Sequence, residues 1–144
     1  MIKNERQYRI TKAHAEKFAK AIQEMTRSPQ RVEHPALRKA QIDAMKSQLE
    51  DLQREIKEYE TLRSGKRRVV TLGSLEELPK TLIQARIAAG LSQEDLAAKL
   101  GLKPQQIQRY EATEYQAASF ERVQEIMRVL GVKLRRPAAL RFAS

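Results

Sequence analysis

The stretch PQQIQRYEA, residues 104–112, concentrates three glutamines and an arginine on one short segment that hydrogen-bonds well and packs poorly. A glutamine amide can form two hydrogen bonds with adenine, and an arginine guanidinium can form two with guanine. Each good pair discriminates against the wrong base by about 1–3 kcal/mol. A helix with such an edge is suited to reading DNA bases, and the alternative interpretation is an ordinary polar surface.

Short helices are expected to position this segment. The first covers about residues 79–89 and is ended by a glycine. The second begins at Ser92, whose hydroxyl can cap backbone N–H groups, and stops before Gly101. The third is the segment 104–112 itself, with Pro104 at its opening.

The flanks of this region carry further signals. A fourth helix is expected to begin after Ser119 and to end at Gly131. Upstream, Ser74 and Glu77 have capping-box spacing, and the four residues 69–72, VVTL, are a candidate short strand. The apolar residues that the fourth helix is expected to bury are Phe120, Val123, Ile126, Met127 and Leu130.

The second and third helices have the local pattern of a helix-turn-helix, in which the second helix of the pair is offered to the major groove. Ala97 is small where two helices joined by a short turn must cross. Gly101 occupies a turn position that favours a positive φ. The apolar contact between the two helices is expected to come from Leu96, Ala97, Leu100, Leu102 and Ile107.

The run ARIAAGLSQEDLAAKLGLKPQQIQRYE, followed by VLGVKL, resembles the helix-turn-helix domain of lambdoid phage repressors and XRE-type bacterial regulators. The resemblance covers about residues 78–134 and rests on GLSQEDLA, the LG turn, Ile107 and Glu111. It implies a repressor-like fold of four to five helices that binds double-stranded DNA. Residues 1–63 have only a looser likeness to regulators of toxin–antitoxin operons with added helices, HigA-like ones among them.

The resemblance also implies roles for individual residues. Gln93 would grip a phosphate and brace the third helix, whereas Gln105, Gln106 and Arg109 would point into the groove. Gln108 lies about 70–100° around the helix from those side chains and would reach a phosphate or face water. The complete set expected to contact DNA is Gln93, Lys103, Gln105, Gln106, Gln108 and Arg109.

Other residues are expected to support the motif. The resemblance implies an ion pair between Arg86 and Glu111 that ties the first helix to the end of the third. Tyr110 would pack in the core or reach a phosphate. At Thr113 the sequence departs from the family, where a glycine commonly follows the glutamate, so the loop must cap the third helix differently. The supporting set is Arg86, Ser92, Ala97, Gly101, Ile107 and Glu111.

Residues 1–63 predict a helical hairpin. A first helix is expected to be capped by Thr11, and a longer one runs from about Pro35 to Leu62 without glycine or further proline. About 28 residues make a rod of roughly 40 Å. Apolar residues on the long helix alternate three and four apart, which is the spacing of a coiled-coil seam. They are Ile42, Met45, Leu49, Leu52, Ile56 and Tyr59.

The partner of this seam stays open. The first helix is expected to be about half as long, so part of the seam would remain uncovered. Three interpretations remain: a closed hairpin, self-association through the long helix, and binding of a different protein.

The charge and composition narrow the class of protein. There are 28 Lys and Arg against 18 Asp and Glu, a formal charge of +10, which favours a polyanionic partner. The basic arms at 65–68 and 132–144 would follow phosphates, enter a minor groove or remain solvated. There is no cysteine, and His14 and His34 lack partners at metal-ligand spacing, so no metal, cofactor or catalytic residue is expected. No apolar run approaches a membrane span, and a cytoplasmic location is expected.

The sequence therefore predicts an all-α protein in four parts. These are a helical hairpin at 1–63 for dimerisation or partner binding, a basic linker at 64–74, a helix-turn-helix domain at 75–134, and a basic tail at 135–144. The expected function is a sequence-specific transcriptional regulator, a repressor that acts as a homodimer through the major groove. The alternative is an antitoxin whose N-terminal helices bind a cognate toxin while the C-terminal domain regulates its own operon.

Overall fold

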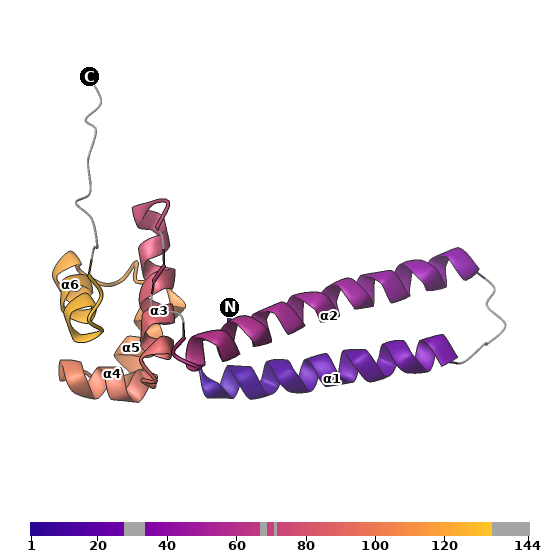
Figure 1. Ribbon diagram of the computed structural model, residues 1–144, viewed down its shortest axis with the longest axis horizontal. Coiled ribbons are helices and arrows are strands. Elements are labelled where there is room, and N and C mark those ends of the chain that lie inside the picture. Colours follow the sequence, from indigo (N-terminus) through magenta and orange to yellow (C-terminus); the bar gives the residue numbers. More distant parts are fainter. Residues whose placement is uncertain (28–33, 67–68, 71, 134–144) are drawn as a thin grey trace, which may run out of the picture. The chain divides into compact units, whose positions relative to one another are not determined.

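The computed structural model describes residues 1–27, 34–66, 69–70 and 72–133, and these ranges are all-α, as the sequence predicts (Figure 1). The chain divides into two compact units, residues 1–64 and 65–144. Within the described ranges, no helix is both long and apolar enough to cross a bilayer. The expected basic tail at 135–144 and the arginines at 67 and 68 lie outside the described residues.

The first unit is an antiparallel hairpin of α1 (Glu5–Arg27) and α2 (Pro35–Arg63), with 23 and 29 residues. The start expected at Thr11 is wrong, and α1 begins about two turns earlier, at Glu5. The backbone N–H of Gln7 donates to Asn4 Oδ1 (2.9 Å), and the Gln7 side chain accepts from the backbone N–H of Lys3 (2.8 Å). These two bonds satisfy N–H groups at the helix start in the manner of a capping box.

The longer α1 changes how the hairpin closes. Its inward residues also alternate three and four apart, so two seams of the same spacing face each other. The proposed α2 seam residues are half-buried, and Tyr59 is buried. The expectation that the first helix is about half as long as the second is therefore wrong, since α1 has 23 residues and α2 has 29. The inward residues of α1 are Tyr8, Thr11, Ala15, Phe18, Ile22 and Met25.

Polar and aromatic contacts close the end of the hairpin near the first residues. The rings of Tyr8 and Tyr59 stack with centroids 5.2 Å apart. The Tyr8 hydroxyl donates to Glu60 Oε1 (2.6 Å), and the N-terminal amine lies 2.9 Å from Glu55 Oε1. These contacts fix the register of α1 on α2.

The second unit contains the short 3₁₀ helix η1 (Leu75–Glu77) and four α-helices. These are α3 (Leu78–Ala88), α4 (Gln93–Leu100), α5 (Pro104–Ala112) and α6 (Phe120–Val129). The helix boundaries expected from the sequence agree with these to within two residues. The apolar side chains of this unit that are almost fully buried are Leu82, Ile83, Leu96, Ala97, Ile107 and Ile126.

Three details of the second unit differ from expectation. Phe120 is 75% exposed, because it is the first residue of α6 and precedes the inward stripe around Ile126. Ser74 forms no side-chain cap, since the Glu77 carboxylate accepts from the backbone N–H of Gly73 instead (2.7 Å). The described residues of the segment 69–72 form no strand.

Candidate nucleic-acid interface

Helix α4 is fixed at its start by a reciprocal cap. The backbone N–H of Asp95 donates to Ser92 Oγ (3.0 Å), and the backbone N–H of Ser92 donates to Asp95 Oδ2 (2.8 Å). The Ser92 hydroxyl donates to the same carboxylate (2.7 Å). These hydrogen bonds hold the pKa of Asp95 below its usual value. The sequence-predicted cap at Ser92 is therefore present.

The turn after α4 depends on Gly101, which has φ 65° and ψ 30°. The N–H of Leu102 reaches back to the carbonyl of Ala97 (2.8 Å), which is the bond of a Schellman motif. A Cβ at Gly101 would meet no atom within 4 Å, so the positive φ and not a lack of space favours glycine there. Ala97 is fully buried where α4 and α5 pack together.

Helix α5 begins with Pro104 in its first turn. The backbone N–H of Lys103 donates to the side-chain oxygen of Gln106 (3.1 Å). Gln106 therefore uses its amide oxygen to cap its own helix, a role that the sequence did not predict. The Gln106 side chain is exposed, and its amide N–H groups take no part in this cap.

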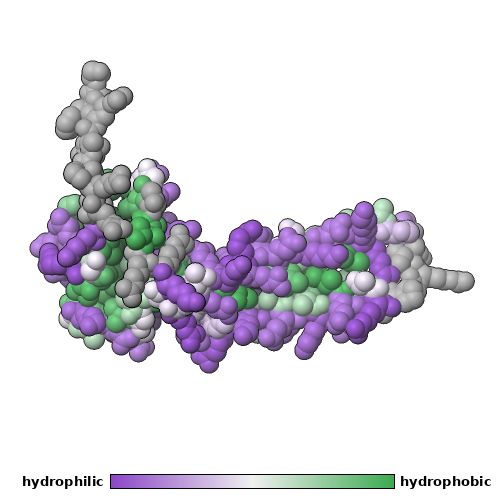
Figure 2. All heavy atoms as spheres, viewed as in Figure 1, coloured by the Kyte–Doolittle hydropathy of each residue, from purple (hydrophilic) through white to green (hydrophobic). Residues whose placement is uncertain are grey.

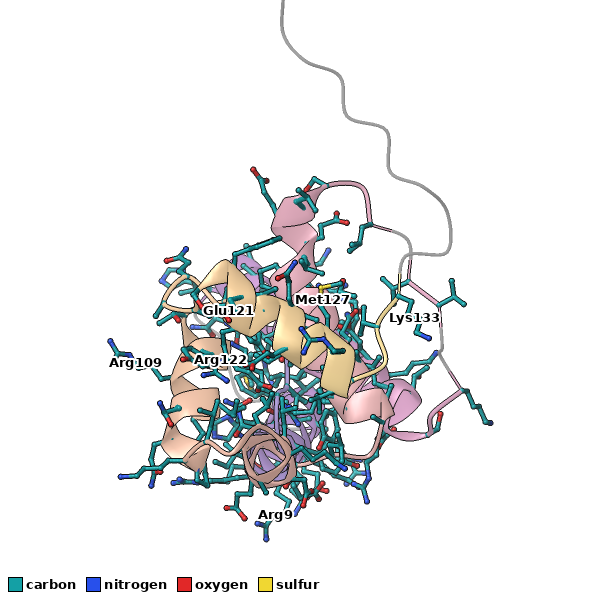
Figure 3. All side chains as sticks on the ribbon, turned by 90° about the vertical axis from the view of Figure 1, so that its left-hand side faces the viewer. Arg9, Arg109, Glu121, Arg122, Met127 and Lys133 are labelled. Carbon is teal, nitrogen blue, oxygen red and sulfur yellow. The ribbon has the colours of Figure 1, made fainter. Side chains whose placement is uncertain are left out.

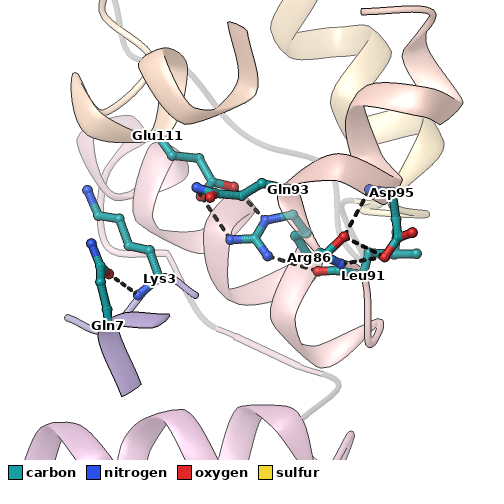
Figure 4. Close-up of polar contacts among 8 residues, drawn as sticks. Lys3, Gln7, Arg86, Leu91, Gln93, Asp95 and Glu111 are labelled. Carbon is teal, nitrogen blue, oxygen red and sulfur yellow. Dashed lines mark hydrogen bonds and ion pairs between the residues drawn. The ribbon is translucent and has the colours of Figure 1, made fainter. Parts of the chain in front are cut away.

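A buried ion pair holds α3 to the end of α5 (Figure 4). Arg86 Nε and a terminal nitrogen of its guanidinium lie 2.6 and 2.8 Å from the two carboxylate oxygens of Glu111. The other terminal nitrogen donates to the carbonyl of Leu91 (2.8 Å). The two side chains are 2% and 0% exposed, so the expected pair is present and excluded from water.

Gln93 joins this pair from the first turn of α4. Its side-chain nitrogen donates to Glu111 Oε2 (2.7 Å), which links α4 to α5 (Figure 4). The bracing role implied for Gln93 therefore has a structural basis. Three helices meet at one carboxylate, and α5 is fixed relative to both α3 and α4.

The opposite side of α5 is exposed. Ile107 is fully buried and anchors the helix in the core. The expected DNA-contacting residues of α5 and its start face solvent, and Arg109 projects away from the unit in Figure 3. These exposed residues are Lys103, Gln105, Gln106, Gln108 and Arg109, whereas Gln93 is half-buried. The five sequence-predicted residues at the start of α5 and along it are therefore all exposed.

The loop after α5 has Thr113 where related domains commonly have a glycine, and it leaves the helix by a backbone path that the sequence did not predict. Thr113 ends the helix, and Glu114 and Tyr115 then take positive φ angles of 49° and 60°. Tyr115 is 4% exposed, stacks on Tyr110 with centroids 6.2 Å apart, and donates its N–H to the Tyr110 carbonyl (2.7 Å). Burial raises the pKa of Tyr115, and its hydroxyl has no hydrogen-bond partner among the described residues. The buried ring anchors a backbone conformation that glycine would otherwise favour.

The geometry and the comparison with known families agree. The helix-turn-helix family model HTH_3 matches residues 82–136. The chain therefore carries a helix-turn-helix domain of the XRE type, and the resemblance noted from the sequence is confirmed for this domain. Such a domain implies DNA binding in the service of transcriptional regulation. No curated protein and no solved structure matches the chain.

Proposed function

We propose that the protein is a dimeric, sequence-specific transcriptional repressor that reads the major groove of double-stranded DNA with α5. The observation that carries this proposal is the exposed polar edge of α5, held in place by the buried contacts of Glu111. Occupancy of the operator is the simplest mechanism, because bound protein then blocks access to the DNA. This role places the site of action in the cytoplasm.

Base readout is assigned to Gln105 and Arg109. They are four residues apart on α5 and therefore neighbours on one helical face. Both are exposed, and neither side chain is engaged by another described residue. A glutamine with both amide ends available suits adenine, and an arginine suits guanine. Gln106 is a donor-only contact in this scheme, since its oxygen caps α5.

Phosphate contacts are assigned to the remaining polar residues of the surface. Lys103 at the start of α5 and Gln108 on its flank are exposed. Gln93 donates its amide N–H to Glu111, and its half-buried side chain in the first turn of α4 is assigned a phosphate contact in addition to this bond. Phosphate contacts position a protein on the duplex without reading its sequence.

Dimerisation is assigned to the hairpin. Within α1 only Ala15 is buried, and within α2 only Tyr59 and Leu62. Figure 2 shows the hydrophobic residues of the hairpin as a band that runs along it between two hydrophilic edges. A second copy of the hairpin laid on this band would bury it as a four-helix bundle does. A symmetric dimer would then bind two half-sites about one helical turn, ~34 Å, apart.

The base-reading assignment is tested by Gln105→Ala and Arg109→Ala, with Gln108→Ala as the matched control on the flank of the same helix. Binding to DNA from upstream of the protein's own gene is measured against a random duplex. Each of the first two variants should lose about 1–3 kcal/mol of discrimination, and the control should lose little. Circular dichroism should show unchanged helicity. Wild-type discrimination in both variants would refute the role of α5.

The oligomer assignment is tested by sedimentation equilibrium of the full chain. The wild-type protein should be a dimer, and Leu49→Glu in the middle of the band should shift it to monomers while α5 still contacts one half-site. A wild-type monomer at all concentrations would refute dimerisation through the hairpin.

An antitoxin is the second candidate function, and the same half-buried band favours it. In that case a toxin protein would cover the hairpin instead of a second copy, and the helix-turn-helix domain would regulate the shared operon. Co-expression of the full chain with the protein encoded beside its gene tests this. A stable complex that Leu49→Glu disrupts would support the antitoxin, and separate elution of the two proteins would exclude that partner.

A further inference from the structure

Of the two hairpin helices, only α1 has a net positive charge. Helix α1 contains six Lys and Arg against three Glu, whereas α2 contains six against six Asp and Glu. The two helices have similar lengths and the same seam spacing, so the difference concerns the outward surface alone. Solubility alone would not require the net positive charge to lie on one of the two helices.

Five of the six basic residues on α1 form one stripe: Arg6, Arg9, Lys17, Lys20 and Arg27. Successive members are three, seven or eight residues apart, which keeps them on one helical face. That face is opposite the inward residues that pack on α2, and all five side chains are exposed. We call this set the basic stripe.

The sixth cation of α1 is differently placed. Lys12 lies on the flank of the helix with its Nζ 5.8 Å from the centre of the Tyr8 ring. The members of the basic stripe, by contrast, form no ion pair in the part of the chain that the structure describes. Glu16 and Glu24 share the outward side of α1, yet neither is paired with a neighbouring lysine or arginine there. The stripe is thus left available to an outside anion.

The dimensions of the stripe fit a duplex. It extends over 21 residues, or about 32 Å at 1.5 Å per residue. One turn of B-DNA is about 34–36 Å. Ala13 lies at the middle of the stripe and Ile10 beside it, whereas Glu24 lies within it between Lys20 and Arg27. Five cations against this carboxylate and the neighbouring Glu16 leave the outward face of α1 with a net positive charge.

We infer that the basic stripe of α1 is a second DNA-contacting surface, which binds the phosphate backbone of duplex flanking the half-site that α5 reads. This inference rests on the proposed DNA-binding function and extends it to the hairpin. DNA is favoured over an acidic protein because the same chain already carries a DNA-binding domain. A duplex held by α5 presents more phosphates to the rest of the chain at high local concentration.

The test is the salt dependence of DNA binding by the full chain. The probes are the shortest duplex that the protein protects in its own upstream DNA, and the same duplex with about 15 added base pairs at each end. Log affinity falls with log salt by about 0.9 for each phosphate neutralised. Wild type should therefore show a steeper slope on the long duplex than on the short one. The triple variant Arg9→Gln/Lys17→Gln/Lys20→Gln should lose that extra slope, by up to about 2.7 per protomer.

The matched control is Lys39→Gln/Lys46→Gln/Lys57→Gln, which removes the same charge from exposed positions on α2. It should keep the extra slope on the long duplex. If both triple variants lost the extra slope equally, net charge alone would explain it. If the α1 triple variant kept the extra slope, α1 would not contact DNA. Either result overturns the inference. Arg109→Ala distinguishes a failure of base reading by α5 from a failure of phosphate contact by the basic stripe. This variant should lose sequence discrimination yet retain the extra slope on the long duplex. If wild type does not bind duplex DNA at all, the proposed function itself fails.

Discussion

The two units of this chain reach a fixed structure by opposite means. The helix-turn-helix unit uses short helices around a few side chains that are almost fully excluded from water, including the ion pair of Arg86 and Glu111. The hairpin uses two long helices with a repeated seam in which most apolar side chains are only half-buried. Stability in the first is concentrated in single residues, and in the second it is spread over many similar contacts. Substitutions should therefore have sharply different effects in the two units.

The largest effect is expected at Glu111. Glu111→Ala leaves the Arg86 guanidinium buried without its carboxylate, which typically costs about 3–5 kcal/mol. The free energy of unfolding of the second unit, measured by urea denaturation, should fall by that amount. The double variant Arg86→Met/Glu111→Leu should recover most of the loss, since no charge is then left buried. Equal destabilisation of the single and double variants would show that the loss of stability comes from packing and not from an unpaired buried charge.

Two matched side-chain truncations, one in each unit, test this contrast between full and partial burial. Ile107→Ala removes a fully buried side chain from α5 and should cost about 2–5 kcal/mol. Leu49→Ala removes a half-buried side chain from α2 and should cost roughly half as much, because part of it is already exposed to water. Thermal unfolding followed by circular dichroism measures both. Equal costs would contradict the contrast drawn between the units.

A smaller effect is expected at the turn between α4 and α5. Gly101→Ala forces a Cβ into the left-handed region and should cost about 1–2 kcal/mol. Gly101→Asn should cost less, because asparagine tolerates this conformation better. Since the site has room for a Cβ, the two variants isolate backbone strain from crowding. The denaturant midpoints of both variants measure this cost. Equal midpoints would mean that backbone strain at position 101 does not account for the loss of stability.

The smallest effect is a pH dependence from Asp95. Its pKa is lower in the folded state than its usual value of 3.8, because it accepts hydrogen bonds from Ser92. The ionised carboxylate therefore stabilises α4 fully above that value, and this stabilisation is lost as pH falls through the lower folded pKa. The melting temperature of wild type should exceed that of Asp95→Asn at pH 7, and the difference should shrink below pH 4. A constant difference across this range would mean that ionisation of Asp95 is irrelevant.

The sequence predicted the second unit well because its signals are local. Ser92, Gly101 and Pro104 each act through backbone geometry within a few residues, so the boundaries of α4 and α5 follow from them directly. Phe120 was misplaced because an apolar residue at a helix start has no partner defined by periodicity alone. The role of Tyr115 was missed because positive φ angles at two residues without glycine leave no sequence signature.

The hairpin was predicted in outline, and its details were not. The α2 seam is visible in the sequence as a heptad pattern, but Asn4 and Thr11 are both residue types that cap helices, and the start of α1 predicted at Thr11 lies too late. In the structure, Asn4 and Gln7 bond to N–H groups at the helix start. That error shortened α1 and made the seam look uncovered. The basic stripe was also not seen, because it emerges only when α1 extends back to Glu5 and its inward face is known.

The meeting of three helices at Glu111 has a consequence for any duplex that the protein grips. A reading helix clamped to its neighbours has little freedom to tilt or slide and so adapt to an imperfect groove. In the proposed complex the duplex would then be the adjustable partner and would bend or change its groove width to fit. Base steps that no side chain touches would influence affinity through their stiffness, so flexible steps between half-sites would favour the complex.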